Sequence, residues 1–202
     1  MLNSIMIRTG STIAGGAAVL AAALLLAGCT TSTLAGRPTG IANAGYCLAA
    51  TQRTPPPRTA LRACQAALAD VSLPAHDRAA TLINRGIIHM HLKNLPAAIA
   101  DFDAAIGSRP DVAEAYVNKG IALVNMGERD AEAIAVLNEA LERNPARPAL
   151  VYYSRAVANE QLGRARAAYE DYSRAAQLDP AWTEPAQQLQ RFRVVRGKTA
   201  AG

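Results

Sequence analysis

The sequence predicts an all-α protein made of antiparallel helix pairs that stack into a superhelix and end in a capping helix. Half of its residues are hydrophobic, mainly Ala, Leu, Val and Ile, while only 4% are aromatic. This composition suits closely packed helices better than a β-sandwich, which depends on β-branched and aromatic side chains. Similar segments follow one another at intervals of about 35 residues in the second half of the chain, a spacing typical of stacked helical repeats.

Residues 1–28 have the pattern of a targeting segment. Arg8 supplies a short positive region, and the apolar stretch from Ile13 to Leu26 is shorter than the ~20 residues of a membrane span. The following "LAGC", from Leu26 to Cys29, resembles the lipobox of bacterial lipoproteins. The resemblance implies that the signal is removed before Cys29 and that Cys29 carries diacylglycerol and an acyl chain. The alternative is a plain signal peptide or an anchor helix that happens to end in cysteine.

The lipobox also bears on the compartment. Residue 30 is Thr rather than the Asp that retains such lipoproteins at the inner membrane. The resemblance therefore implies a bacterial cell-envelope protein, held at the outer membrane by its lipid and facing the periplasm. Residues 29–45 are small, polar and nearly uncharged, so we predict a lipidated flexible tether.

Three later segments share their landmark residues. Each has a large residue, then Gly or Ala, then an Ala–large–Ala pattern, then Pro. This order resembles the tetratricopeptide repeat (TPR) family, in which each unit is a helix pair, and it divides residues 79–180 into units 79–112, 113–147 and 149–180. The corresponding positions are Leu82, Tyr116 and Tyr152; Gly86, Gly120 and Ala156; Ala98, Ala133 and Ala168; Phe102, Leu137 and Tyr172; Ala105, Ala140 and Ala175; and Pro110, Pro145 and Pro180.

Residues 46–78 are interpreted as a degenerate helix pair that precedes these units. Ala60, Cys64 and Ala67 have the Ala–large–Ala spacing of a second helix, and Cys47 falls where the partner helix would face it. Exported proteins oxidise well-placed thiols, so we predict a Cys47–Cys64 disulfide. Two free buried thiols are the alternative.

Residues 181–202 are predicted to form a capping helix and a basic tail. Trp182, Ala186, Leu189 and Phe192 have a helical spacing, and the opposite face is rich in Gln and Arg. Repeat arrays need such a closing helix because the last unit otherwise exposes its core face. The chain carries a net charge of +5, and we expect its basic residues to be solvated or to contact an anionic envelope surface. Scattered basic residues with few aromatics do not predict nucleic-acid binding.

The sequence predicts no enzyme, no metal site and no cofactor. His89 and His91 are two residues apart, so on a helix they point in different directions, and we expect His89 to be a satisfied core histidine. Asp101 and Asp171 are expected to be solvated carboxylates on second helices. No nucleophile signature and no glycine-rich phosphate loop is present in the sequence.

The TPR resemblance implies a concave groove lined by first helices, where the family binds protein partners. The positions that carry a carboxylate clamp in some members hold apolar residues here, which suits an amphipathic helix or a hydrophobic peptide. Burial by neighbouring repeats or by self-association would also explain apolar residues there. The predicted groove residues are Ile83, Ile87, Met90, Val117, Ile121, Val124, Tyr153 and Val157.

Together these features predict a non-enzymatic, membrane-anchored adaptor that binds protein partners in cell-envelope assembly or maintenance. The anchor would raise the local concentration of the repeats at one surface. The alternatives are a pilotin-like or pilus and secretion-assembly lipoprotein, and a structural role through self-assembly.

Overall fold

The computed structural model describes residues 39–192, and the signal segment, Cys29, most of the tether and the last residues of the tail lie outside this range. Every regular element within it is an α-helix, which confirms the all-α prediction. The helices are α1 (Gly40–Thr51), α2 (Ala60–Ala69), α3 (Ala75–His91), α4 (Leu95–Ser108), α5 (Ala113–Met126), α6 (Asp130–Glu142), α7 (Pro148–Gln161), α8 (Ala165–Leu178) and α9 (Thr183–Leu189).

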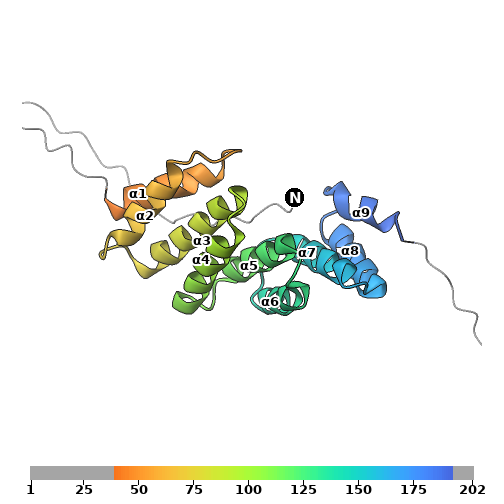
Figure 1. Ribbon diagram of the computed structural model, residues 1–202. Coiled ribbons are helices and arrows are strands. Elements are labelled where there is room, and N and C mark those ends of the chain that lie inside the picture. The colour runs from red at the N-terminus through yellow and green to blue at the C-terminus, as the bar shows by residue number, and fades with distance from the viewer. Residues whose placement is uncertain (1–38, 193–202) are drawn as a thin grey trace, which may run out of the picture.

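The helices pack as pairs in chain order, α1 with α2, α3 with α4, α5 with α6 and α7 with α8. Each pair also contacts the next one, and α9 packs against α8. Figure 1 shows the pairs following one another from α1 and α2 at one end to α9 at the other. This arrangement is the stacked array that the repeats predict.

Small residues allow the two helices of a pair to approach closely. A Cβ atom on Gly86 of α3 would lie 2.5 Å from the Phe102 ring of α4, and one on Gly120 of α5 would lie 2.5 Å from the Leu137 side chain of α6. Both distances are well inside van der Waals contact, so any side chain at these glycines would force the helices apart. The sequence pattern of Gly opposite a bulky residue therefore sets the spacing within these two pairs.

The first helix begins earlier than predicted. Residues 40–45, assigned to the flexible tether by sequence, form the first half of α1. Thr39 caps the helix by accepting a hydrogen bond from the Ala42 N–H at 3.3 Å, and the Gly40 N–H donates to Asp70 Oδ2 at 2.8 Å. Ala44 is buried in a cluster with Ala67 and Leu73. The tether prediction is wrong for these six residues because tertiary contacts order a segment whose composition alone looks flexible.

The closing helix is shorter than predicted. It spans seven residues and ends at Leu189 rather than continuing through Phe192. The chain then turns, and the Phe192 ring lies 5.9 Å from the Tyr169 ring and 6.0 Å from the Tyr172 ring, between centroids. At the start of α9, Trp182 lies 4.8 Å from Tyr153. The array is thus closed by aromatic packing on both sides of a short helix.

One large apolar cluster runs through the helices from α3 to α7, and smaller clusters lie at the two ends. Within residues 39–192, no helix combines the length and apolar character needed to cross a bilayer.

Candidate functional site

The two cysteines of the N-terminal pair lie together in the structure. Cys47 from the middle of α1 and Cys64 from the middle of α2 are fully buried, with their Sγ atoms 2.11 Å apart and their Cα atoms 5.0 Å apart. They pack with Ala50, Ala60 and Ile88, the last of which belongs to α3. The disulfide therefore closes the first helix hairpin at the point where that hairpin rests on the first complete unit. Cys29 lies outside the described residues.

The predicted groove residues do not line an exposed groove. Six of them are exposed by 7% or less and belong to the core cluster; these are Ile83, Ile87, Met90, Val117, Ile121 and Val124. The same cluster contains Ala115, Ala122 and Ala158, small residues on the first helices of the second and third units. These alanines let successive first helices approach, and the larger side chains fill the space between them. The prediction of an exposed apolar groove is wrong for these six positions.

The other two predicted residues lie nearer the C-terminal end. Tyr153 and Val157 of α7 are partly buried and pack beside Tyr172. The Tyr153 ring also meets Trp182, so it takes part in closing the array. Burial raises the pKa of the Tyr153 hydroxyl above its ordinary value. This corner is part of the hydrophobic closure rather than an open binding face.

Two partly buried ion pairs recur at the same place in the first and third units. Arg85 of α3 holds Asp101 of α4 through hydrogen bonds of 2.8 and 2.5 Å, and Arg155 of α7 holds Asp171 of α8 at 2.9 and 2.6 Å. Hydrogen bonding to the carboxylates raises the pKa of both guanidinium groups. The expectation that Asp101 and Asp171 are solvated is wrong, because both carboxylates are buried and paired.

These pairs were not predicted from the sequence, although the sequence carries a signal for them. In each unit the arginine comes directly before the small residue of the first helix, Gly86 or Ala156, and the aspartate directly before the bulky residue of the second helix. The separation between arginine and aspartate is 16 residues in both units. A bidentate arginine–carboxylate pair fixes the relative orientation of the two helices that carry it.

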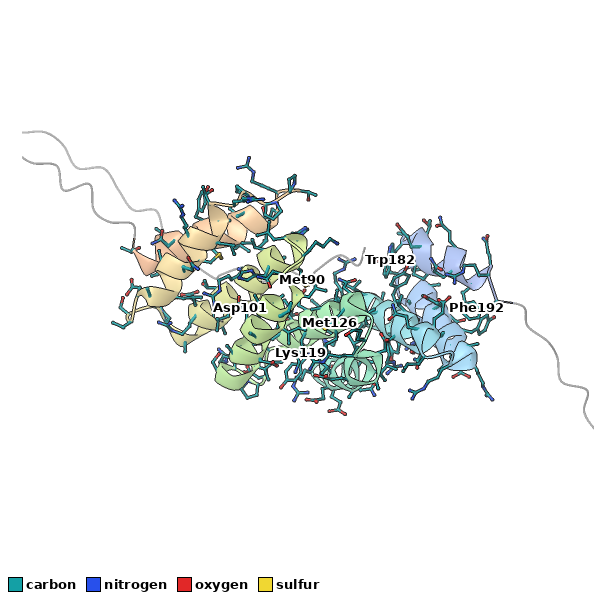
Figure 2. All side chains as sticks on the ribbon, viewed as in Figure 1. Met90, Asp101, Lys119, Met126, Trp182 and Phe192 are labelled. Atoms are coloured by element: carbon teal, nitrogen blue, oxygen red, sulfur yellow. A yellow bond between two sulfur atoms is a disulfide. The ribbon has the colours of Figure 1, made fainter. Side chains whose placement is uncertain are left out.

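Basic residues at this position also join neighbouring units. In the second unit Lys119 of α5 lies 2.7 Å from Asp103 of the preceding α4. In the third, Arg155 also donates to Asn138 of the preceding α6 at 2.6 Å. Asp103 and Asn138 each follow the bulky residue of their second helix, so the contact repeats with the units. These contacts form a polar seam along the array, in which the charged groups pair with one another. Figure 2 labels two of these charged residues, Asp101 of α4 and Lys119 of α5.

A shallow cavity of about 350 Å³, widely open to solvent, lies where the N-terminal pair meets the first complete unit. Its lining combines one cation, two polar side chains and two leucines, namely Arg58, His89, Asn94, Leu61 and Leu92. Arg58 is exposed and forms no ion pair with any carboxylate of residues 39–192. Such a lining can accept an apolar side chain beside a carboxylate or a backbone carbonyl.

His89 is the titratable group of this cavity. It comes from the last turn of α3, and its Nε2 lies 4.0 Å from Asp101 Oδ2. Burial lowers the pKa of the imidazole, Asp101 partly opposes this effect, and Arg85 adds to it. The neutral ring can therefore donate or accept one hydrogen bond near neutral pH. The structure places His89 at a cavity wall, partly accessible, rather than wholly in the core.

No candidate metal centre appears among the described residues, since no three His, Cys, Asp or Glu side chains gather there in a suitable arrangement.

Comparison with known proteins gives matches at the level of repeats and fold. The tetratricopeptide repeat profile matches residues 57–113, 83–148 and 117–182. No curated protein matches the sequence. Among solved structures, the first TPR domain of the human RPAP3 protein is 22% identical, with a TM-score of 0.55, over 58% of this chain and 91% of that one. MamA from Desulfovibrio magneticus RS-1 is 24% identical, with a TM-score of 0.60, over 73% of this chain and 81% of that one.

Proposed function

Because this chain belongs to the tetratricopeptide repeat family, we propose that it is a non-enzymatic adaptor that holds a protein partner at a bacterial envelope membrane. Tetratricopeptide repeats serve as protein-binding scaffolds, and the matched residues 57–182 include the three complete units. This family match carries the proposal. The repeats supply the binding face, while the lipid supplies the location.

The anchor in this proposal is diacylglycerol and an acyl chain on Cys29, after removal of residues 1–28. The apolar stretch followed by "LAGC" supports it. Two or three acyl chains give stable membrane attachment without a spanning helix. The neighbouring positions of Cys47 and Cys64 also support an oxidising compartment outside the cytoplasm, because such a pair forms a bond there. Thr30 after the lipidated cysteine favours the outer membrane.

The partner is proposed to bind at the cavity between the N-terminal pair and the first complete unit. Leu61 and Leu92 offer apolar contact, and Arg58, His89 and Asn94 offer polar contact beside it. Leu92 is among the more exposed large apolar residues of the described chain. A short peptide segment with one apolar and one acidic or terminal carboxylate group fits this lining.

The test is photocrosslinking in the source bacterium. A photoreactive amino acid at position 92 should capture a defined protein, and the same group at Leu162, an exposed leucine at the end of α7, serves as the matched control. Adding Arg58→Glu to the protein with the photoreactive group at position 92 should abolish capture, while the helicity measured by circular dichroism stays unchanged. Capture that is equal at both positions would overturn the cavity as the binding site.

The anchor is tested separately. Cys29→Ala should leave the precursor unprocessed and free of labelled fatty acid, whereas the parent protein takes up the label and is found in the outer-membrane fraction. Uptake of label by the variant would overturn lipidation at Cys29. The crosslinked partner distinguishes the envelope-maintenance role from a pilotin-like role, because a secretin or pilus subunit would then be the captured protein.

A further inference from the structure

The N-terminal helix pair has an outer face that differs from the rest of the array. Residues 39–69 contain no Asp or Glu but contain Arg53, Arg58 and Arg62. Helices α1 and α2 form the end of the array opposite α9 (Figure 1). The later units, in contrast, carry carboxylates that pair with their basic residues. The terminal pair is thus a cationic end on an otherwise balanced array.

Large apolar side chains are exposed on the same pair. Helix α1 contains no charged residue, and its Ile41 and Tyr46 are 51% and 50% exposed. Val71, in the turn between α2 and α3, is 96% exposed. The hydrogen bond from the Gly40 N–H to Asp70 holds this turn beside the first turn of α1. A terminal repeat normally needs a polar outer surface for solubility, and these exposed apolar residues depart from that rule.

Two of the arginines are uncompensated. Arg53, just after α1, and Arg62, in the first half of α2, are exposed, and within residues 39–192 neither pairs with a carboxylate. The nearest acidic residue along the chain, Asp70, already accepts hydrogen bonds from Gly40 and Ser72. Exposed cations on the same helix pair as exposed apolar and tyrosine side chains are the combination that binds the headgroup region of an anionic bilayer.

The position of this face relative to the proposed anchor points to the same partner. Ten residues separate Thr39, at the start of α1, from Cys29, so the connecting chain spans at most ~35 Å. The end of the array that carries α1 and α2 is therefore the part that the anchor holds nearest to the lipid. This step depends on the proposed lipidation of Cys29, whereas the composition of the face does not.

We propose that the outer face of the α1–α2 pair docks on the surface of an anionic phospholipid bilayer. Helix α1 lies along the headgroups, with Ile41, Tyr46 and Val71 at the apolar boundary and Arg53 and Arg62 against phosphate groups. Docking would fix the orientation of the array on the membrane, and with it the orientation of the cavity beside the N-terminal pair where the partner is proposed to bind. An acidic protein surface is the competing occupant.

The test uses the chain that processing would leave, residues 29–202 with Cys29→Ser, so that no lipid can be attached. Removing residues 1–28 takes away none of the helices α1–α9. Its binding is measured by sedimentation with vesicles of phosphatidylcholine alone and with vesicles that also contain phosphatidylglycerol, at low ionic strength. We expect binding to the mixed vesicles and little binding to the neutral ones.

Variants locate the binding face. Arg53→Glu with Arg62→Glu should weaken partitioning into the mixed vesicles at least about thirtyfold, since the loss of each basic residue near such a surface costs about fivefold and the new carboxylates are repelled by it. The matched control is Arg164→Glu with Arg174→Glu, two exposed arginines of the last unit that give the same change in net charge. The control should bind within about threefold of the parent chain, because its charges are far from the docking face. Ile41→Asp should also weaken binding, and circular dichroism checks that each variant keeps its helices.

Several outcomes would overturn the proposal. One is equal binding to neutral and mixed vesicles; another is an equal loss in the Arg53/Arg62 variant and in the control. A third is unchanged vesicle binding together with loss of a crosslinked acidic protein in the Arg53/Arg62 variant, which would make the face a protein-docking site. Absence of lipid on Cys29 would refute the anchor of the proposed function but would leave this vesicle result to stand by itself.

Discussion

The disulfide between Cys47 and Cys64 gives the sharpest prediction about stability. The two residues are 17 apart in sequence, so the bond closes a short loop that includes the connection from α1 to α2. In the chain-entropy model a loop of this size contributes about 3 kcal/mol to the free energy of unfolding. Replacing both cysteines, Cys47→Ala with Cys64→Ala, should remove this contribution.

The loss of stability should be confined to the α1–α2 pair. In stacked repeats each pair contacts only its neighbours, and the α1–α2 pair rests on α3 alone among the later helices. The end pair should therefore open about a hundredfold more often in the double variant, since 3 kcal/mol corresponds to that factor. Helices α5 to α8 should keep the opening free energy of the parent protein.

Hydrogen–deuterium exchange followed by mass spectrometry measures this difference directly. Amides of α1 and α2 should exchange much faster in the double variant than in the parent, with no change in α7 and α8. A reducing agent should reproduce the effect in the parent and leave the variant unaffected, which controls for the lost side-chain packing. Equal exchange of α1 and α2 in both proteins, or two alkylatable thiols in the native exported protein, would refute the reasoning.

Three further predictions concern single positions. Gly120→Val should lower the free energy of unfolding by ~1–3 kcal/mol because the new side chain clashes with Leu137, while Gly107→Ala on the open face of α4 should raise it by ~0.5–1 kcal/mol. Chemical denaturation measures both variants, and equal effects would contradict the close approach of α5 and α6 at Gly120. Asn84 is buried and neither its amide nitrogen nor its amide oxygen has a hydrogen-bond partner, so Asn84→Leu should raise the free energy of unfolding by about 1 kcal/mol. Asn118→Leu should lower it, because the hydrogen bond that the Asn118 amide donates to the Glu114 carbonyl at 2.8 Å is lost. A lower free energy of unfolding in both variants would show that the Asn84 amide is hydrogen-bonded. Burial lowers the pKa of His89, so below the ordinary value near 6.5 the unfolded chain binds a proton more readily than the folded chain does, and the free energy of unfolding should fall as pH drops from 7 toward 5. His89→Gln should flatten this part of the pH–stability curve. An unchanged curve would exclude His89 as the source of the pH dependence.

The repeats could be identified from sequence because their landmarks are local and periodic. Gly86 and Phe102, or Gly120 and Leu137, stand at fixed positions in each unit, and the structure places each glycine against its bulky partner. The start of α1 could not be read in the same way. The segment from Gly40 to Gly45 is small and uncharged, and what orders it is a hydrogen bond to Asp70, 30 residues away.

The candidate sites also combine features that are visible in the sequence with features that depend on tertiary contacts. Family position predicted a partner-binding groove or burial by neighbouring repeats for the apolar residues of the first helices, and the structure buries six of them, because burial depends on how closely successive units approach. The cavity combines Arg58 and Leu61 from the N-terminal pair with His89, Leu92 and Asn94 from the first complete unit, and no single motif contains all five. The Arg85–Asp101 and Arg155–Asp171 pairs were detectable as a repeated spacing, yet only their geometry shows that they are buried.

The sequence by itself determined the all-α class, the number of complete units and the helix-pair spacing, since these follow from the periodic placement of small, bulky and proline residues along the chain. The tertiary structure decided which faces are available to a partner. Accessibility is a property of neighbouring units rather than of any one residue: Ile121 is buried because the first helices pack together, and Ile41 is exposed because no unit packs on the outer side of α1 in the described part of the chain.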